Sequence, residues 1–391
     1  MHNSVQSYFQ IAFIAQPYHS MPQRQSLIFR AMLLIFALAG GANAFPAGAE
    51  RDADGRYMNR YADLSKSQGF LSWQWTRLTE GLPRPPKAPT PQMPFNEALI
   101  RQPQGLAQVT WIGHSSVLYQ IDGVNLLLDP VYAEYASPLP PLGPKRAQPP
   151  GIPFESLPHI DGVLISHNHY DHLDLDSVRR LMQQPGGSPV FFVPSGVDQW
   201  FNDNVAGAQT AGEHRNVIAL DWDESAILAG KQQALTMRFL AVQHWSARSL
   251  SDRNKTLWGS WVVEHPRFRF WFAGDLAYSP DIEDIARQHG GFDLAAIPIG
   301  VYDPRWFMKR AHVDPAEATQ VFRTIRARNA FAIHWGTFDG LSDESLDEPP
   351  IAFERARQEA AIPADAFRLL RIGETRSYNP VSRSTATQAK P

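Results

Sequence analysis

The chain has 391 residues, with 36 Lys and Arg, 39 Asp and Glu, 13 His and no Cys, so its formal charge is −3. An apolar share of 43% suffices for a large core and excludes general disorder. The near-neutral balance argues against a non-specific nucleic-acid surface. The lack of Cys excludes disulfides, thiolate metal sites and a thiol nucleophile, so any transition metal must be held by His, Asp or Glu.

The first 44 residues follow the three-part pattern of a secretory leader. A short apolar run at 31–39 follows Arg24 and Arg30 and precedes Ala42-Asn-Ala44, a small-residue cleavage pattern. The run is shorter than the roughly 20 residues that span a bilayer. We therefore expect an exported protein, periplasmic or membrane-associated, with Met21 as a better start codon and an uncleaved anchor as the alternative.

Residues 45–105 are predicted to form an N-terminal arm with a proline-rich connector. Proline lacks the backbone donor and fixes φ, so its density here excludes a continuous helix or a central strand. The prolines concerned are Pro83, Pro85, Pro86, Pro89, Pro91 and Pro94. We expect one folded domain at 106–375, followed by a polar tail at 376–391.

Strand and helix patterns alternate between 106 and 375. Asp122-Gly123 is a hairpin signal between two β-favouring runs. Helices are predicted after Asp174, from Ser279-Pro280 to Gly290, and from Asp314, where Glu317 completes a capping-box pattern. Strands are predicted at 108–112, 116–119, 124–129, 162–166, 190–193, 217–220, 235–242, 258–263, 268–272, 294–297 and 330–334. This alternation predicts a layered α/β or α+β fold.

The densest chemical signal is a cluster of potential ligands directly after the strand at 162–166. His167 and His169 lie on one side of an extended stretch, so both can reach one ion. Asp171 and His172 follow where the chain turns toward a helix, and they can face a second ion. A carboxylate and neutral imidazoles suit Zn²⁺. The alternative, a polar loop with histidines at chance positions, is disfavoured by the fixed pattern.

Four ligands do not complete two metal sites, so the rest are expected at later strand ends. His244, Asp275 and His334 each follow an apolar run. For each alone, a structural role is an equal alternative. Together they complete a set in which His167, His169 and His244 hold one ion, Asp171, His172 and His334 hold the other, and Asp275 bridges. Structural or surface roles are expected for His114, His159, His214, His265 and His289.

Further residues are candidates for the substrate side. His312 precedes a helix and is a candidate proton donor or substrate group, Tyr170 lies within the ligand loop, and Trp306 is part of an apolar segment beside two cations. Arg305 is a candidate for the substrate phosphate, with a structural ion pair as the alternative. Asp174 is either an orienter of a ligand His or a helix cap.

These motifs resemble the metallo-β-lactamase superfamily, and within it the group of N-acylphosphatidylethanolamine-hydrolysing phospholipases D. The similar stretches lie at 110–115, 128–130, 143–146, 165–174, 243–248, 258–261, 272–275, 302–308, 312–315 and 332–338. The resemblance implies an αββα sandwich with two zinc ions at the sheet edge and the seven ligands named above. It also implies hydrolysis of an N-acylated phospholipid to phosphatidate and an N-acylethanolamine.

In that reaction, a hydroxide bridging the metals is expected to attack phosphorus. Asp171, as a ligand, and His312 or a water, as proton donor, are expected to take part. Iron or manganese are alternatives to zinc, and the partner is a phospholipid at a membrane surface rather than nucleic acid. Two other hypotheses remain: a metal-dependent lactonase or amidase of the same fold, and a non-catalytic lipid-binding protein of the envelope.

Overall fold

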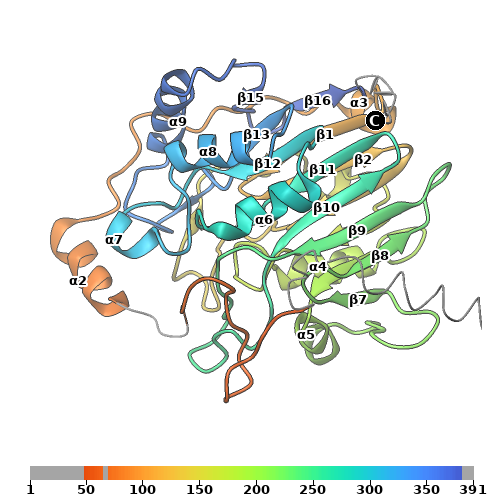
Figure 1. Cartoon of the computed structure of the whole chain (residues 1–391), viewed down its shortest axis with the longest axis horizontal. Coiled ribbons are helices and arrows are strands. Elements are labelled where there is room, and N and C mark those ends of the chain that lie inside the picture. Colours follow the sequence, from red (N-terminus) through yellow and green to blue (C-terminus); the bar gives the residue numbers. More distant parts are fainter. Residues whose placement is uncertain (1–47, 65–68, 381–391) are drawn as a thin grey trace, which may run out of the picture. The chain divides into compact units, whose positions relative to one another are not determined.

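The computed structural model describes residues 48–64 and 69–380, and the predicted leader lies outside them. Two seven-stranded mixed sheets dominate the fold (Figure 1). The first contains, in spatial order, β16 (Thr375–Tyr378), β1 (Ala107–Gly113), β2 (Ser116–Ile121), β3 (Val124–Leu128), β5 (Gly162–Leu164), β6 (Val190–Pro194) and β7 (Val217–Leu220).

The second sheet contains β15 (Phe367–Arg368), β13 (Ala330–Ile333), β12 (Leu294–Pro298), β11 (Phe268–Phe272), β10 (Ser260–His265), β9 (Leu235–Leu240) and β8 (Ser225–Leu228). A small ribbon pairs β4 (Lys145–Arg146) with β14 (Phe338–Asp339). The strands of both sheets carry buried apolar side chains that meet in one core. For example, the ring of Tyr119 on β2 lies 4.5 Å from that of Phe270 on β11.

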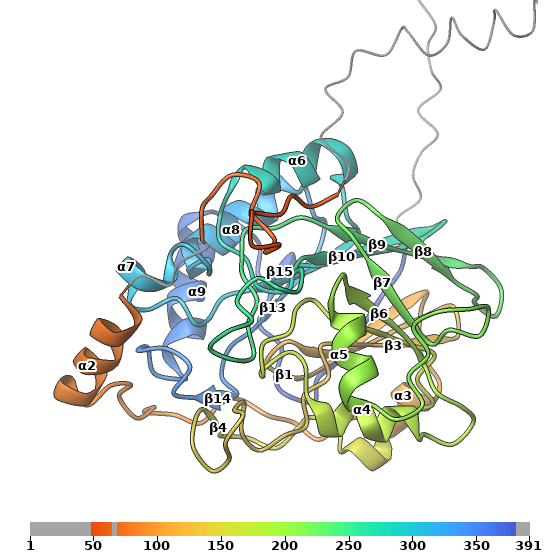
Figure 2. The ribbon, with the colours of Figure 1, turned by 90° about the horizontal axis from the view of Figure 1, so that it is seen from below.

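Helices cover the outer face of each sheet, which produces four layers (Figure 2). α4 (Leu175–Met182) and α5 (Val197–Asn204) share an apolar cluster with the first sheet. α6 (Pro280–His289), α8 (Pro315–Thr324) and α9 (Glu348–Glu359) contribute to the core on the side of the second sheet. The predicted αββα layering is therefore confirmed. In the described residues, no helix combines the length and the apolar character that a membrane span requires.

Several elements were predicted correctly from local patterns in the sequence. The predicted hairpin joins β2 and β3, with Asp122 at φ 51° and Gly123 at φ 78°, the positive values that a two-residue turn requires. α8 begins with a capping box in which Asp314 accepts from the amide of Glu317. α4 begins at Asp174, whose side chain accepts from two amides of the first turn.

The end of the folded domain differs from the prediction. β16 starts at Thr375 and pairs antiparallel with β1, so the sheet includes residues that were assigned to the polar tail. Its side chains are polar because they hydrogen-bond to neighbours on β1: Thr375 Oγ1 lies 2.8 Å from Thr110 Oγ1, and Ser377 donates to Gln108. A polar edge strand has no alternation of apolar and polar residues, so β16 could not be predicted from the sequence pattern.

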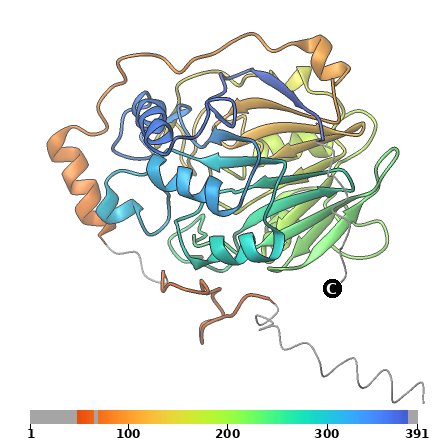
Figure 3. The same ribbon diagram turned by 45° about the horizontal axis from the view of Figure 1, so that its top comes forward.

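The predicted arm contains two helices, α2 (Phe70–Glu80) and α3 (Glu97–Arg101). The proline-rich connector runs between them along the outside of the domain (Figure 3). It is tied down by backbone bonds of Pro91 and Met93 with Ile372 and by the Thr90 hydroxyl, which donates to the carbonyl of Gly336 over 2.6 Å. Two further short helices are α7 (Arg305–Met308) and a 3₁₀ turn at Phe154–Ser156.

Candidate active site

The candidate ligands lie at one edge of the two sheets because they follow strands that run in the same direction. β3 and β5 are parallel, as are β11, β12 and β13, and β9 shares the direction of β11 through antiparallel β10. The carboxyl ends of such strands are where α/β folds place their ligands. The residues concerned are His167 after β5, His244 after β9, Asp275 after β11 and His334 after β13.

The first predicted ligand set comes together as expected from its residues. His169 Nδ1 lies 2.8 Å from His167 Nε2 and 3.4 Å from His244 Nε2. Asp275 Oδ2 lies 3.7 Å from His167 Nε2 and 3.8 Å from His244 Nε2. His167, His244 and Asp275 are buried and His169 is partly exposed, and the ligand atoms of all four lie within 4.8 Å of one another.

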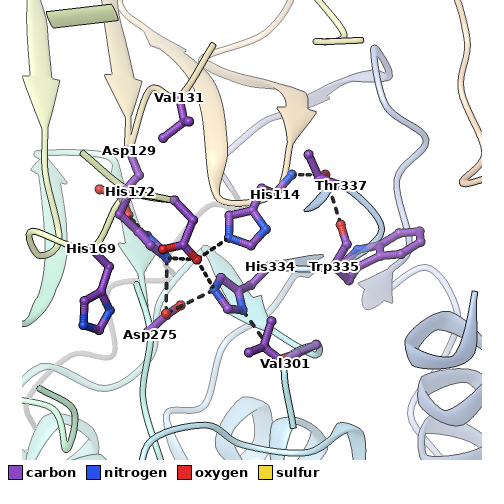
Figure 4. A network of polar contacts seen from close by, with 12 residues as sticks. His114, Asp129, Val131, His169, His172, Asp275, Val301, His334, Trp335 and Thr337 are labelled. Carbon is purple, nitrogen blue, oxygen red and sulfur yellow. Dashed lines mark hydrogen bonds and ion pairs between the residues drawn. The ribbon is translucent and has the colours of Figure 1, made fainter. Parts of the chain in front are cut away.

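The second set shares Asp275 with the first. Asp275 Oδ2 lies 3.2 Å from His172 Nε2 and 3.1 Å from His334 Nε2. Asp171 Oδ2 lies 3.5 Å from each of the same two nitrogens. Figure 4 shows Asp275 between His172 and His334. The carboxylate assigned to the bridging position therefore lies between the two groups of imidazoles.

His114 belongs to the same cluster, although the sequence placed it among structural or surface residues. It follows β1, is buried, and its Nε2 lies 3.0 Å from Asp171 Oδ2. Its backbone carbonyl accepts from the amide of His334. His114 follows an apolar strand, as His244, Asp275 and His334 do, so the pattern that predicted those three residues as ligands also applies to His114. The other described histidines, His159, His214, His265 and His289, are in none of the candidate metal groups.

Asp129 orients two of the imidazoles from behind. The His172 Nδ1–H donates to its carboxylate over 2.7 Å, and Ser166 donates through its amide over 2.7 Å and its hydroxyl over 2.6 Å. The Ser166 hydroxyl oxygen in turn lies 2.9 Å from His167 Nδ1 and accepts from it. One buried carboxylate thus directs the Nε2 atoms of His167 and His172 toward the cluster, a role expected of outer partners in metal sites.

Backbone conformation at the site is strained. His334 has φ 61°, His114 has φ 53° and Asp129 has φ 38°, in the left-handed region that residues with a Cβ rarely adopt. Such strain persists where surrounding contacts over-determine the conformation, and it concentrates at functional sites.

The electrostatics divide the imidazoles of the cluster into a neutral pair and a pair that holds protons beside the carboxylates. Burial and the neighbouring imidazoles hold the pKa of His167 and His169 well below its usual range, so both rings are neutral. Burial also acts on His172 and His334, but nearby carboxylates, Asp275 first, outweigh it and raise the pKa of His334 to about 9 and that of His172 well above the usual value. A bound cation would take the place of those protons.

The cluster passes a geometric test for metal ligation. Tetrahedral ligands at 2.0–2.1 Å from an ion are separated by about 3.3 Å, and the separations above scatter around that value. His172 Nε2 and His334 Nε2, which face the cluster, are buried with no hydrogen-bond partner in the described part of the chain, a cost that unliganded polar atoms rarely bear. Nitrogen and oxygen donors of this kind suit zinc and also iron or manganese.

A cavity of about 700 Å³ opens onto the cluster. His169, Asp171, Asp275 and His312 all line it. Its apolar wall comes mainly from α2 and α7 and contains Phe70, Trp73, Trp306, Phe307, Met308 and Leu341. The ring of Trp73 stacks on Phe307 at 4.8 Å, which fastens α2 to α7.

The predicted substrate residues have different fates. Tyr170, Trp306 and His312 line the cavity, and His312 Nδ1 is buried, 3.9 Å from Asp275 Oδ2. Arg305 does not line the cavity. Its guanidinium pairs with Glu317 at 2.7 Å and Asp314 at 3.4 Å and donates to the carbonyl of His312. Its geometry therefore matches the structural alternative, because its charge is already compensated. Asp174 likewise fits the cap, and Asp129 takes the orienting role considered for it.

Two cations line the cavity: Arg310, one of the two that follow the segment of Trp306 and were considered for a lipid phosphate, and Arg253, which was not predicted. Arg253 lies 4.2 Å above the ring of Trp245, which itself lies edge-on to His169 at 4.2 Å. Arg253 and Arg310 each donate to a backbone carbonyl of residues 63–64, and neither pairs with a carboxylate within the described residues. Burial and then the neighbouring guanidinium of Arg310 lower the pKa of Arg253 to about 10.

Comparison with known proteins agrees with this architecture. Residues 124–335 match the family described as "Beta-lactamase superfamily domain". The chain is 42% identical over 241 residues to N-acyl-phosphatidylethanolamine-hydrolyzing phospholipase D 1 of Caenorhabditis elegans, which covers 61% of this chain and 67% of that protein. It is 34% identical over 243 residues to the protein described as "N-acyl-phosphatidylethanolamine-hydrolyzing phospholipase D, mitochondrial" of Saccharomyces cerevisiae. This alignment covers 61% of this chain and 49% of that protein.

A solved structure described as a possible metal-dependent hydrolase from Veillonella parvula superposes with a TM-score of 0.54 at 15% identity, covering 70% of this chain and all of that one. At this identity the likeness concerns the fold alone. The family match, which spans more than half of the chain, shows that this protein belongs to the metallo-β-lactamase superfamily and resembles its N-acylphosphatidylethanolamine-hydrolysing phospholipase D group.

Proposed function

We propose that this protein is a zinc-dependent phosphodiesterase of phospholipase D type that hydrolyses N-acylphosphatidylethanolamine-like lipids to phosphatidate and an N-acylethanolamine. The observation that carries the proposal is the joint presence, in one cavity, of the His and Asp cluster, an aromatic wall and two arginines that pair with no carboxylate of the described residues. The printed descriptions of the nematode and yeast relatives name this substrate for those proteins.

The side chains divide the work of such a reaction. Divalent ions held by the seven predicted ligands would supply Lewis acidity and a nucleophilic water at neutral pH. His312 is kept neutral because burial lowers its pKa well below the usual value, although Asp275 opposes this. A neutral imidazole that lines the cavity can hydrogen-bond to a substrate oxygen and orient it, and it can hold a water molecule that gives its proton to the leaving alkoxide.

The arginines fit the charge of a phospholipid. Arg253 and Arg310 would attract the phosphate as it enters and neutralise it in a partly buried setting, where such a contact is stronger than in water. The aromatic wall from α2 and α7 offers an apolar surface to acyl chains.

The outer face of α2 suggests how a lipid would reach the cavity. Leu71, Trp75 and Leu78 lie at i, i+4 and i+7 and are 82%, 69% and 81% exposed. Trp73 of the same helix lines the cavity. An exposed apolar stripe of this kind lies favourably in a lipid interface. We propose that α2 rests on a membrane surface, and that the mature chain acts outside the cytoplasm.

The test uses purified full-length protein loaded with zinc and incubated with vesicles that contain N-palmitoyl phosphatidylethanolamine, in water labelled with ¹⁸O. Mass spectrometry should find N-palmitoylethanolamine, and phosphatidate with one ¹⁸O on phosphorus. An acyl-homoserine lactone is assayed in parallel. His169→Ala and Asp275→Asn should abolish lipid turnover with little loss of fold. Lactone opening without phosphatidate release would replace this proposal by the lactonase hypothesis, and no turnover by loaded protein would favour lipid binding alone.

A further inference from the structure

The first part of the N-terminal arm, residues 48–64 and hereafter the arm, makes direct contact with the backbone of a candidate metal ligand. The side chain of Asn59 is buried, with 8% of the residue exposed. Its Nδ2 donates to the carbonyl of His244 over 2.9 Å, and its Oδ1 accepts from the amide of His244 over 3.0 Å. A single side-chain amide thus pairs both polar backbone groups of His244, as a neighbouring strand would.

His244 needs such a partner because it lies beyond its own strand. β9 ends at Leu240, and the isolated backbone bridge that follows it joins Gln243, not His244, to Ala277. The ring of His244 is held separately, since its Nδ1 donates to the carbonyl of Ala311 over 2.9 Å. Buried backbone groups must be paired, and the peptide groups of His244 are paired by Asn59.

The arm is anchored next to this contact. The amide of Tyr57 donates to the carbonyl of Asn254 over 2.8 Å, and Asn254 Nδ2 donates back to the carbonyl of Tyr57 over 3.2 Å. Asn254 also closes the loop that follows His244, because its amide donates to the carbonyl of Ser246 over 2.7 Å. Arm and ligand loop therefore form one hydrogen-bonded unit.

We propose that Asn59 is a positioning residue for the metal ligand His244, so that docking of the arm and metal binding are coupled. The inference rests on the metal site of the proposed function but not on its substrate. Because coupling between two equilibria is reciprocal, a metal that requires the placement of His244 must also hold the arm in place. A purely structural arm would stabilise the fold without changing the metal affinity.

The arm provides a matched control. Tyr61, two residues further along and 44% exposed, donates to Asp284 over 2.6 Å, so Tyr61→Phe removes an arm contact that does not involve His244. In Asn59→Ala, both polar groups of the His244 backbone lose their partner. In Asn59→Asp, the acceptor for the amide remains and only the donor to the carbonyl is lost.

The experiment measures zinc affinity of the full-length variants by competition with a chromophoric chelator, and hydrogen exchange of arm peptides with and without zinc. We expect Asn59→Ala to weaken zinc binding about 10- to 100-fold, the range for groups that orient ligands, with Asn59→Asp in between and Tyr61→Phe within about twofold of wild type. Zinc should slow exchange of the 57–64 segment in wild type but not in Asn59→Ala.

Equal zinc affinity in Asn59→Ala and Tyr61→Phe would overturn the coupling, as would an arm whose exchange ignores zinc. If Asn59→Ala does not fold, the zinc affinity of Asn59→Asp is compared with that of Tyr61→Phe instead, and equal affinities again overturn the coupling. A wild-type protein that binds zinc with these properties but hydrolyses no lipid would refute the proposed function and leave the coupling standing.

Discussion

Replacing Asp129 by Asn should weaken metal binding by moving a proton on His172. In the native site, the carboxylate accepts the Nδ1–H of His172 over 2.7 Å and the hydroxyl of Ser166 over 2.6 Å through the same oxygen. If the side-chain oxygen of the Asn keeps the hydrogen bond from the Ser166 amide, its NH₂ group takes the place of the carboxylate oxygen that faces His172 and the Ser166 hydroxyl. His172 must then accept at Nδ1 and carry its proton on Nε2, the atom that faces Asp275 over 3.2 Å.

A protonated Nε2 cannot bind a cation. To bind the metal, His172 must move its proton back to Nδ1, where the NH₂ group of the Asn cannot accept it, and this lost hydrogen bond lowers the metal affinity. Loss of such an outer partner typically lowers metal affinity 10- to 100-fold, or about 1.4 to 2.7 kcal/mol. The larger figure applies here because the hydroxyl of Ser166 loses the same acceptor, and with it the orientation of His167.

The assay is zinc affinity by chelator competition, and the control is Asp174→Asn. Asp174 caps α4, and Asn is about as good a cap as Asp, so that variant should lose only a few tenths of a kcal/mol in stability and no metal affinity. If Asp129→Asn binds zinc as tightly as Asp174→Asn does, the tautomer argument is wrong.

Three further predictions follow from other parts of the molecule. Arg310→Gln should raise KM for N-acylphosphatidylethanolamine about tenfold with a smaller change in kcat, and should weaken the salt dependence of KM, as measured by steady-state kinetics. Burial, with acidic neighbours adding to it, raises the pKa of Asp281 from 3.8 to about 6, so the folded state binds the extra proton and stability falls as pH rises through that window. Asp281→Asn should therefore stabilise the fold by up to about 3 kcal/mol at pH 8 and by little at pH 4, in urea unfolding. Changing Leu71, Trp75 and Leu78 to Ser should reduce vesicle binding at least tenfold in co-sedimentation, while turnover of a dispersed short-chain lipid is retained.

Much of the fold was accessible from sequence because its signals are local. Capping at Asp174 and Asp314, the Asp122-Gly123 turn and the apolar runs each depend on neighbouring residues. Elements without such signals were missed, including α5, α9 and β16. The side chains of β16 are polar because they hydrogen-bond to β1, a relation between residues more than 250 positions apart in the chain.

The site divides in the same way. Residues that present a nitrogen or oxygen to a metal stand at strand ends, where an apolar run followed by His or Asp is visible in the sequence. His114 satisfies this rule and was passed over because it stands alone in its segment. The orienting role considered for Asp174 belongs to Asp129, because Asp129 is the carboxylate that contacts the Nδ1 of His172.

Orienting residues are hidden from sequence for a physical reason. Asp129 and Asn59 have no chemistry of their own in the reaction, and their effect lies wholly in the partner that each one contacts. The contact between Asn59 and His244 joins positions 185 residues apart, so no local pattern encodes it. A site whose seven candidate ligands follow the ends of four strands needs such contacts, because the loops that hold the ligands have left their sheets. The ligands specify which ions can bind, and the orienting residues determine how much of the binding energy is realised.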